Sequence, residues 1–205
     1  STHLGTFGQQ SNSKRAIPYP IILIHGLNSD DRAWNNFIKD LDLGEAQVVN
    51  AVLNAWPLGW KYEDDVITDF YDSEGKPIRN LTDGNIFKVN FNNWWNENPT
   101  KPMLVQYGEH DRNTLLFSQS NESSITKQGY ALSLIIKKVI DATRAEKVVL
   151  VGHSMGGLAI REYLQRRKKE DGNPKWWNIN EGHKVAKVIT IVTPHLGSNI
   201  TGGIV

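Results

Sequence analysis

A serine flanked by glycines, in the segment Gly152-His153-Ser154-Met155-Gly156, constrains the fold more than any other feature of this sequence. It follows Val148–Val151, an apolar run with the length and β-branched composition of a strand buried on both faces. Apolar residues at helical spacing come next, at Leu158, Ile160, Tyr163 and Leu164. The sequence therefore predicts a buried strand, a tight turn and a helix in direct succession.

The same alternation of strands and helices extends over most of the chain. Apolar runs predict buried strands at Ile21–Ile24 and Val185–Val192, and another strand at Ala46–Leu53. Helical spacing predicts one helix from about Ser29 to Leu41 and another that contains Leu132, Ile135, Ile136 and Val139. Ser29, Asp30 and Asp31 are suited to the cap and first turn of the first helix. Strands alternating with helices indicate an α/β fold with a mostly parallel sheet and helices on both faces.

The domain organisation follows from where this alternation begins and where it is interrupted. Residues 1–19 are polar and lack periodicity, so we expect an N-terminal arm. Residues 20–205 are expected to form one partial α/β domain. Within it, residues 54–121 are interpreted as an insertion that carries a hairpin and one or two sheet strands.

Composition excludes several classes of protein. The 23 Lys and Arg residues balance 22 Asp and Glu residues, which argues against a nucleic-acid partner held by bulk charge. No cysteine is present, which excludes disulfide scaffolds, thiolate metal sites and cysteine nucleophiles. No apolar run approaches the roughly 20 residues of a membrane-spanning helix. We expect no metal and no cofactor.

The glycine-flanked serine has the pattern of a nucleophile elbow, G-x-S-x-G. Side chains at Gly152 and Gly156 would collide with neighbouring backbone in such a strained turn, and Gly157 continues the turn. The N-terminus of the following helix lends partial positive charge where an oxyanion develops. We therefore expect Ser154 to be the nucleophile and the N–H of Met155 to be one oxyanion donor.

A second oxyanion donor is expected from the loop after the first strand. His25-Gly26-Leu27 follows Ile21–Ile24, and the N–H of Leu27 is the candidate. We interpret His25 as a side chain that fixes this loop, and His153, inside the elbow, as structural.

Three blocks together resemble the bacterial triacylglycerol lipases and related lipase-like α/β-hydrolases. They are Pro20–Leu27, Lys147–Gly157 and Thr193-Pro194-His195-Leu196-Gly197-Ser198, in the order of that family. The resemblance implies the α/β-hydrolase fold, a Ser-His-Asp triad and acyl esters, in particular lipid esters, as substrates. Residues 54–121 do not match the family's pattern.

The acid and the histidine of such a triad are not evident. They follow the serine on later strands of this fold, and the residues after Ser154 leave room for about one helix and one strand before a short tail. Glu170 and Asp171 are expected at the wrong end of the helix, and His195 is interpreted as part of a loop beside the site rather than as the base. We therefore expect the C-terminal strands to be missing, with a second polypeptide as one possible source of the acid and base.

Alternatives to the esterase interpretation stay open. An amidase, thioesterase or acyltransferase could use the same elbow, because the elbow does not select the acceptor. A degenerate or incomplete hydrolase could serve as a lipid-binding or interaction module. The pairs Trp94-Trp95 and Trp176-Trp177 could contact a peripheral lipid interface, and we expect a secreted or extracellular protein.

Overall fold

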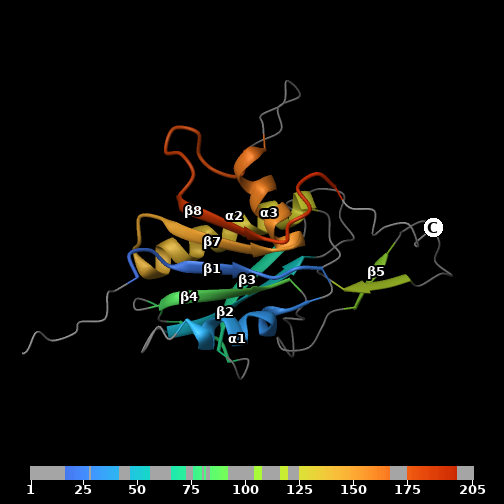
Figure 1. Cartoon of the computed structure of the whole chain (residues 1–205), viewed down its shortest axis with the longest axis horizontal. Helices are drawn as coiled ribbons and strands as arrows, with labels where there is room; N and C mark the ends of the chain where they lie inside the picture. Colours follow the sequence, from blue (N-terminus) through green and yellow to red (C-terminus); the bar gives the residue numbers. More distant parts are fainter. Residues whose placement is uncertain are drawn as a thin grey trace, which may run out of the picture.

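Three layers make up the computed structural model: one main sheet and helices on each of its faces (Figure 1). The structure describes residues 17–27, 29–41, 47–55, 66–72, 76–79, 81, 84–91, 104–107, 116–119, 125–166 and 175–197. In the described part of the chain, no helix is long and apolar enough to cross a membrane.

Six strands form the main sheet in the order β3-β2-β4-β1-β7-β8. All neighbours in this order are parallel except β2 and β3, so the prediction of a mostly parallel sheet is confirmed. The strands are β1 (Ile21–Ile24), β2 (Gln47–Ala55), β3 (Val66–Tyr71), β4 (Gly84–Asn90), β7 (Val148–His153) and β8 (Val185–Ile191). Figure 1 shows β8, β7, β1 and β4 stacked in this order.

The central strands are apolar on both faces because both faces are covered. Ile22 of β1 and Leu150 of β7 are fully buried against helices α2 (Ile125–Thr143) and α3 (Met155–Gln165). Leu23 and Val151, which point to the opposite face, pack with Trp34 in a second buried cluster. Side chains that alternate between two cores explain why these runs lack polar positions.

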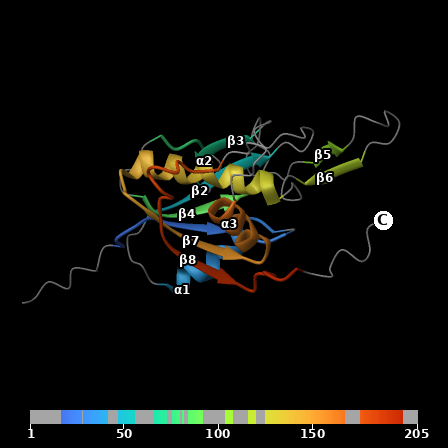
Figure 2. The same ribbon diagram turned by 90° about the horizontal axis from the view of Figure 1, so that it is seen from above.

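Helices α2 and α3 cover one face together. Leu132, Ile135, Ile136 and Val139 of α2 are buried in this core, which confirms the predicted helical face. A methyl group on Gly129 of α2 would lie 2.5 Å from the Glu162 side chain, so the two helices approach closely at this point. Figure 2 shows α2 on the β2 and β4 side of the sheet and α3 next to β7.

The first helical segment differs from the single helix that the sequence predicts. It consists of a 3-10 turn, η1 (Asp31–Trp34), followed by the short helix α1 (Asn35–Asp40). Asp30 is the N-cap of η1, and its carboxylate accepts a hydrogen bond from the N–H of Arg32. The predicted capping role thus belongs to Asp30, while Asp31 is buried.

The stretch 54–121 contributes to the main sheet as well as to a separate hairpin. Strand β4 lies between β2 and β1, and Phe87 and Val89 are fully buried in the core. Strands β5 (Leu104–Tyr107) and β6 (Leu116–Gln119) form an antiparallel hairpin apart from the main sheet (Figures 1 and 2). Residues 84–90 therefore belong to the centre of the fold.

Strand β8 is present as predicted, but its predicted burial is wrong for the described residues. Only Val185 is buried, and the side chains from Ala186 to Thr190 are exposed. Among the described elements, β8 pairs with β7 alone, so its outer edge has no strand partner. Val188 and Ile189 point to opposite faces of the sheet, and both are exposed.

Candidate active site

Ser154 lies at the sharp turn between β7 and α3, where the sequence places it. Its backbone has φ 51° and ψ −119°, a conformation that a residue with a Cβ rarely adopts. The N–H of Ser154 donates to the carbonyl oxygen of Ile191, the last residue of β8, at 2.9 Å. The turn is therefore fixed by the neighbouring strand as well as by its own helix.

The glycines of the turn allow backbone segments to approach each other. A methyl group on Gly156 would lie 2.5 Å from the carbonyl oxygen of Ile24 and 2.7 Å from that of His25. A methyl group on Gly152 would lie 2.7 Å from the N atom of Gly157. The first turn of α3 therefore sits directly on the end of β1, which brings the loop after β1 to Ser154.

That loop packs against the serine at Gly26. A methyl group on Gly26 would lie 3.0 Å from Ser154 Cβ and 3.1 Å from His153 Nδ1. Leu27 follows, with 47% of its side chain exposed. The structure thus brings His25, Gly26 and Leu27 of the first motif to the elbow residues of the second.

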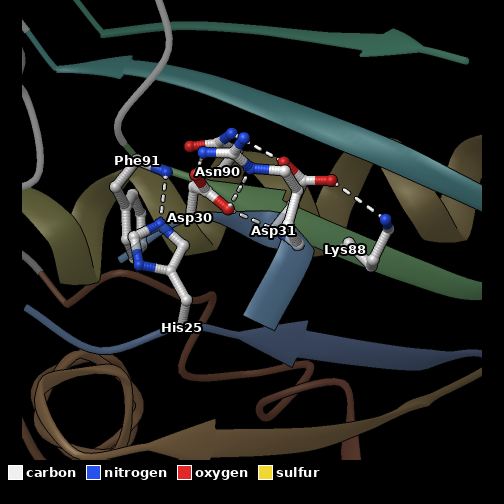
Figure 3. Close-up of polar contacts among 7 residues, drawn as sticks. His25, Asp30, Asp31, Lys88, Asn90 and Phe91 are labelled. Atoms are coloured by element: carbon white, nitrogen blue, oxygen red, sulfur yellow. Dashed lines mark hydrogen bonds and ion pairs between the residues drawn. The ribbon is translucent and has the colours of Figure 1, made fainter. Parts of the chain in front are cut away.

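His25 is fully buried and is hydrogen-bonded through both ring nitrogens; Figure 3 shows the bond to Phe91. Nε2 accepts from the N–H of Phe91 at 2.9 Å, so the proton of a neutral ring is on Nδ1, which lies 2.7 Å from the carbonyl oxygen of Gly26. Burial lowers the pKa of His25 from its ordinary value. A neutral imidazole with a hydrogen bond at each nitrogen can hold this loop in place.

Helix α3 directs its N-terminus toward the serine. Met155 is its first residue and is buried, and its sulfur lies 3.5 Å from Gln128 Nε2 of α2. An 11-residue helix places partial positive charge at this end, where its first N–H groups lack helical partners. This arrangement can stabilise negative charge that develops next to Ser154.

No described acid or histidine hydrogen-bonds to the Ser154 hydroxyl. Glu162 bonds to Arg166 and Trp176 toward the far end of α3, and Glu181 bonds to Asn178 before β8 begins. His183 accepts from the N–H of Val185 at the start of β8. Glu170 and Asp171 lie outside the described residues, so their predicted placement stays untested.

His195 lies in a groove between α3 and β8. The groove encloses about 410 Å³, and Ile160, Leu164 and Val188 are among its apolar lining residues. His195 Nε2 is 3.3 Å from Thr190 Oγ1, and the carbonyl oxygen of His195 accepts from Arg161 at 2.7 Å. These contacts accord with the predicted role of His195 as a loop residue.

The described tryptophan pair is largely packed. Trp176 is buried, stacks with Tyr130 and carries the Arg166 guanidinium over its ring at 4.2 Å. Trp177 is partly buried against the same core. Trp94 and Trp95 lie outside the described residues.

Comparison with known proteins bears on the fold and on one part of the sequence. The sequence model of the lecithin:cholesterol acyltransferase family matches residues 122–201, a range that contains α2, the elbow, α3 and β8. A solved structure of the lin2722 gene product from Listeria innocua superposes with a TM-score of 0.52 at 14% sequence identity. That match covers 87% of this chain and 52% of the Listeria protein.

The chain has the α/β-hydrolase fold. It resembles the lipase-like members of that fold, and residues 122–201 are similar to the lecithin:cholesterol acyltransferase family. A protein from Lactobacillus plantarum WCFS1, described as a cell surface hydrolase, also matches, with a TM-score of 0.47 and 15% identity over 87% of this chain and 55% of that protein. This α/β-hydrolase chain spans about half the length of both solved structures.

Proposed function

We propose that the protein is a carboxylic ester hydrolase of the lipase type that acts through Ser154. The strained turn at Ser154, with Gly26 packed against it and α3 directed at it, is the observation that carries this proposal. A β7–α3 turn of this geometry exposes a serine hydroxyl at the carboxyl edge of the sheet. Secretion stays a prediction.

In the proposed reaction, Ser154 Oγ attacks the carbonyl carbon of an ester. The N–H groups of Leu27 and Met155 stabilise the oxyanion of the tetrahedral intermediate. The alcohol then leaves with the proton that the serine gave up to the base, and an acyl-enzyme remains. Water hydrolyses it and releases the carboxylic acid and the free serine.

Apolar side chains beside the serine support an apolar acyl group. Leu27 is next to Gly26, and Val192 follows Ile191, whose carbonyl holds the N–H of Ser154. Leu27 is 47% exposed and Val192 is 82% exposed, so each of these two segments next to the elbow offers an apolar side chain at the surface. Exposed apolar residues grouped around a reactive serine are suited to binding a hydrocarbon chain.

Acyl transfer is the second candidate, because the matching family is one of acyltransferases. The two reactions share the acyl-enzyme and differ in whether water or an alcohol accepts the acyl group. The partition of a radiolabelled acyl ester between free acid and new ester, with a long-chain alcohol added, measures this choice. Predominant new ester would favour acyl transfer.

The acid and the base are proposed to come from residues outside the described part of the structure. The outer edge of β8, which pairs with no other strand among the described elements, and its exposed apolar side chains provide a place where further strands can pair. A denaturing intact-mass spectrum of the purified protein tests this. A chain heavier than 23.1 kDa, or a second polypeptide, would place these groups outside the 205 residues, and a single species at 23.1 kDa would place them among the residues between 1 and 205 that the structure leaves undescribed.

Ser154→Ala tests the central assignment in the complete protein. We expect loss of turnover of a short-chain chromogenic ester and loss of labelling by a fluorophosphonate. Ser133→Ala is the matched control, because the Ser133 hydroxyl bonds to the Tyr130 carbonyl within α2, and its activity should be unchanged. Equal turnover in the wild type and in Ser154→Ala would contradict the proposal, and absence of labelling in the wild type would favour a non-catalytic binding module.

A further inference from the structure

The loop that carries the Leu27 N–H is tied to the carboxyl end of β4 at both of its ends (Figure 3). The loop runs from His25, just after β1, to Asp31, the first residue of η1. In the register of the sheet, Ile24 at the end of β1 pairs with Val89, so β4 extends one residue further. Asn90 and Phe91 therefore lie beside the point where the loop leaves the sheet.

The first tie is the ring of His25. Phe91 N–H donates to His25 Nε2, and the two rings also meet edge to face with their centroids 5.5 Å apart. Because His25 Nδ1 lies 2.7 Å from the Gly26 carbonyl, the same ring also sets the orientation of the peptide between Gly26 and Leu27. The group that this peptide contributes is the N–H of Leu27.

The second tie is the carboxylate of Asp31, which reaches β4 with both oxygens. Asn90 Nδ2 donates to Asp31 Oδ1 at 2.8 Å, and Lys88 Nζ is 2.9 Å from Asp31 Oδ2. Lys88 also donates to Asn35 Oδ1 at 2.9 Å. The sequence did not indicate this network, because Asp31 and its two partners on β4 are more than 50 residues apart along the chain.

The network is buried in a part of the core where apolar side chains would serve packing better. Asp31 and Lys88 are each only 7% exposed, and they lie on the face of the sheet that holds Leu23, Trp34 and Ile86. A buried ion pair contributes little net stability compared with apolar residues of similar size, because both charges lose their hydration. Its directional contacts do fix geometry, which an apolar pair would not.

We propose that Asp31, Lys88 and Asn90 are positioning residues that hold the oxyanion loop at the correct distance from Ser154. The inference rests on the proposed hydrolase function. Through this network, the position of β4 sets the position of the Leu27 N–H, although no member of the network touches the substrate. A displacement of about 1 Å at such a donor can slow the chemical step by about a hundredfold.

Two variants of the complete protein test the proposal. Asp31→Asn keeps the shape of the side chain and removes its charge. The double variant Asp31→Leu/Lys88→Met replaces the pair by apolar residues of similar size, which preserves or restores stability. The matched control is Asp30→Asn, because Asp30 is the neighbouring carboxylate, pairs with Arg32 at the surface and contacts no residue of β4 in the described structure.

We expect kcat to fall about 10- to 100-fold in both test variants while KM stays within about twofold, because an oxyanion donor acts mainly in the transition state. The control should keep the wild-type kcat. Hydrogen exchange of the peptide that contains Gly26 and Leu27 should become faster in both test variants and not in the control. This second measurement does not depend on activity. It therefore still tests whether β4 holds the loop, even where the Ser154→Ala test contradicts the hydrolase assignment.

Two outcomes would overturn the proposal. Recovery of the wild-type kcat in the stable double variant would mean that the pair serves stability alone. Unchanged hydrogen exchange at Gly26 and Leu27 in both folded variants would mean that β4 does not hold the loop. A variant with too little folded protein at the assay temperature is replaced by Asn90→Ala, which removes one of the two contacts between Asp31 and β4 and leaves the ion pair with Lys88 in place.

Discussion

Gly157→Ala offers a quantitative test of how α3 packs against the segment after β8. An added methyl group at this position would lie 2.0 Å from Thr193 Oγ1, 2.6 Å from Cγ2 and 2.8 Å from Cβ. Ordinary contact between such atoms begins near 3.5 Å, so the Thr193 side chain must retreat by about 1.5 Å. The segment that follows β8 would then shift, and with it the carbonyl of Ile191 that holds Ser154.

The expected loss can be worked out from these contacts. Overpacking of this kind costs about 1–3 kcal/mol, and a severe overlap falls at or above the upper end. Replacing glycine by alanine inside a helix returns about 1 kcal/mol. We therefore expect the free energy of unfolding to fall by about 2 kcal/mol. Urea denaturation measures this change, and the dependence of the free energy on urea concentration should stay as in the wild type.

A double-mutant cycle isolates the clash itself. Thr193→Gly removes all three contacting atoms, so Gly157→Ala in that background should cost nothing or stabilise by up to about 1 kcal/mol. The interaction energy between the two sites should then be about 2–3 kcal/mol. Thr190→Gly on neighbouring β8 is the matched control and should combine additively with Gly157→Ala. An interaction energy below about 0.5 kcal/mol for Thr193 would refute the packing argument.

Three further predictions concern the core and its titrating groups. Leu150→Ala should lower the free energy of unfolding by about 3–4 kcal/mol, because Leu150 is fully buried between β7 and two helices, whereas Leu41→Ala, at a partly exposed site, should change it by less than about 0.5 kcal/mol in the same urea assay. Burial lowers the pKa of His25, so the unfolded chain binds a proton at this residue at a higher pH than the folded chain does. The free energy of unfolding should therefore fall as the pH drops below about 6.5, and the fall should be less steep in His25→Asn. Burial raises the pKa of Tyr163 to about 12, so above pH 10 the hydroxyl ionises in the unfolded chain while it stays protonated in the folded chain. Stability should therefore fall with rising pH, and Tyr163→Phe should reduce that fall in thermal melts at pH 9 to 11.

The strands and the elbow could be predicted because local patterns determine them. Ile21–Ile24 and Val148–Val151 are apolar without alternation, and only a strand with two covered faces accounts for such runs. Gly152 and Gly156 occur where a Cβ atom would lie only 2.5–2.8 Å from backbone atoms of neighbouring segments. In both cases the physical cause and the residues that reveal it are neighbours in sequence.

The central position of β4 and the Asp31 network were not predictable in this way. Strand β4 carries two buried polar residues, Lys88 and Asn90. Their alternation with apolar residues indicates a strand in an insertion, and it does not indicate a strand at the centre of the sheet. Their partner, Asp31, reads in sequence as a helix-capping residue. Only the register of β1 with β4 brings these groups together.

The exposure of β8 shows a different limit. Its sequence indicates a strand covered on both faces, yet the described elements cover little of it. An apolar run indicates that a strand is suited to burial on both faces. In the described part of the chain, only Val185 of β8 is buried.

Strand β1 lies between β4 and β7, and this order has a consequence for synthesis on the ribosome. Both partners of β1 are encoded far downstream, and β7 is the later of the two. At about 5–20 residues per second, the wait from β1 to β7 is on the order of ten seconds. During that time Ile22, Leu23 and Ile24 have no sheet partner on the β7 side, so the nascent chain presents to chaperones the same residues that later support the loop next to Ser154.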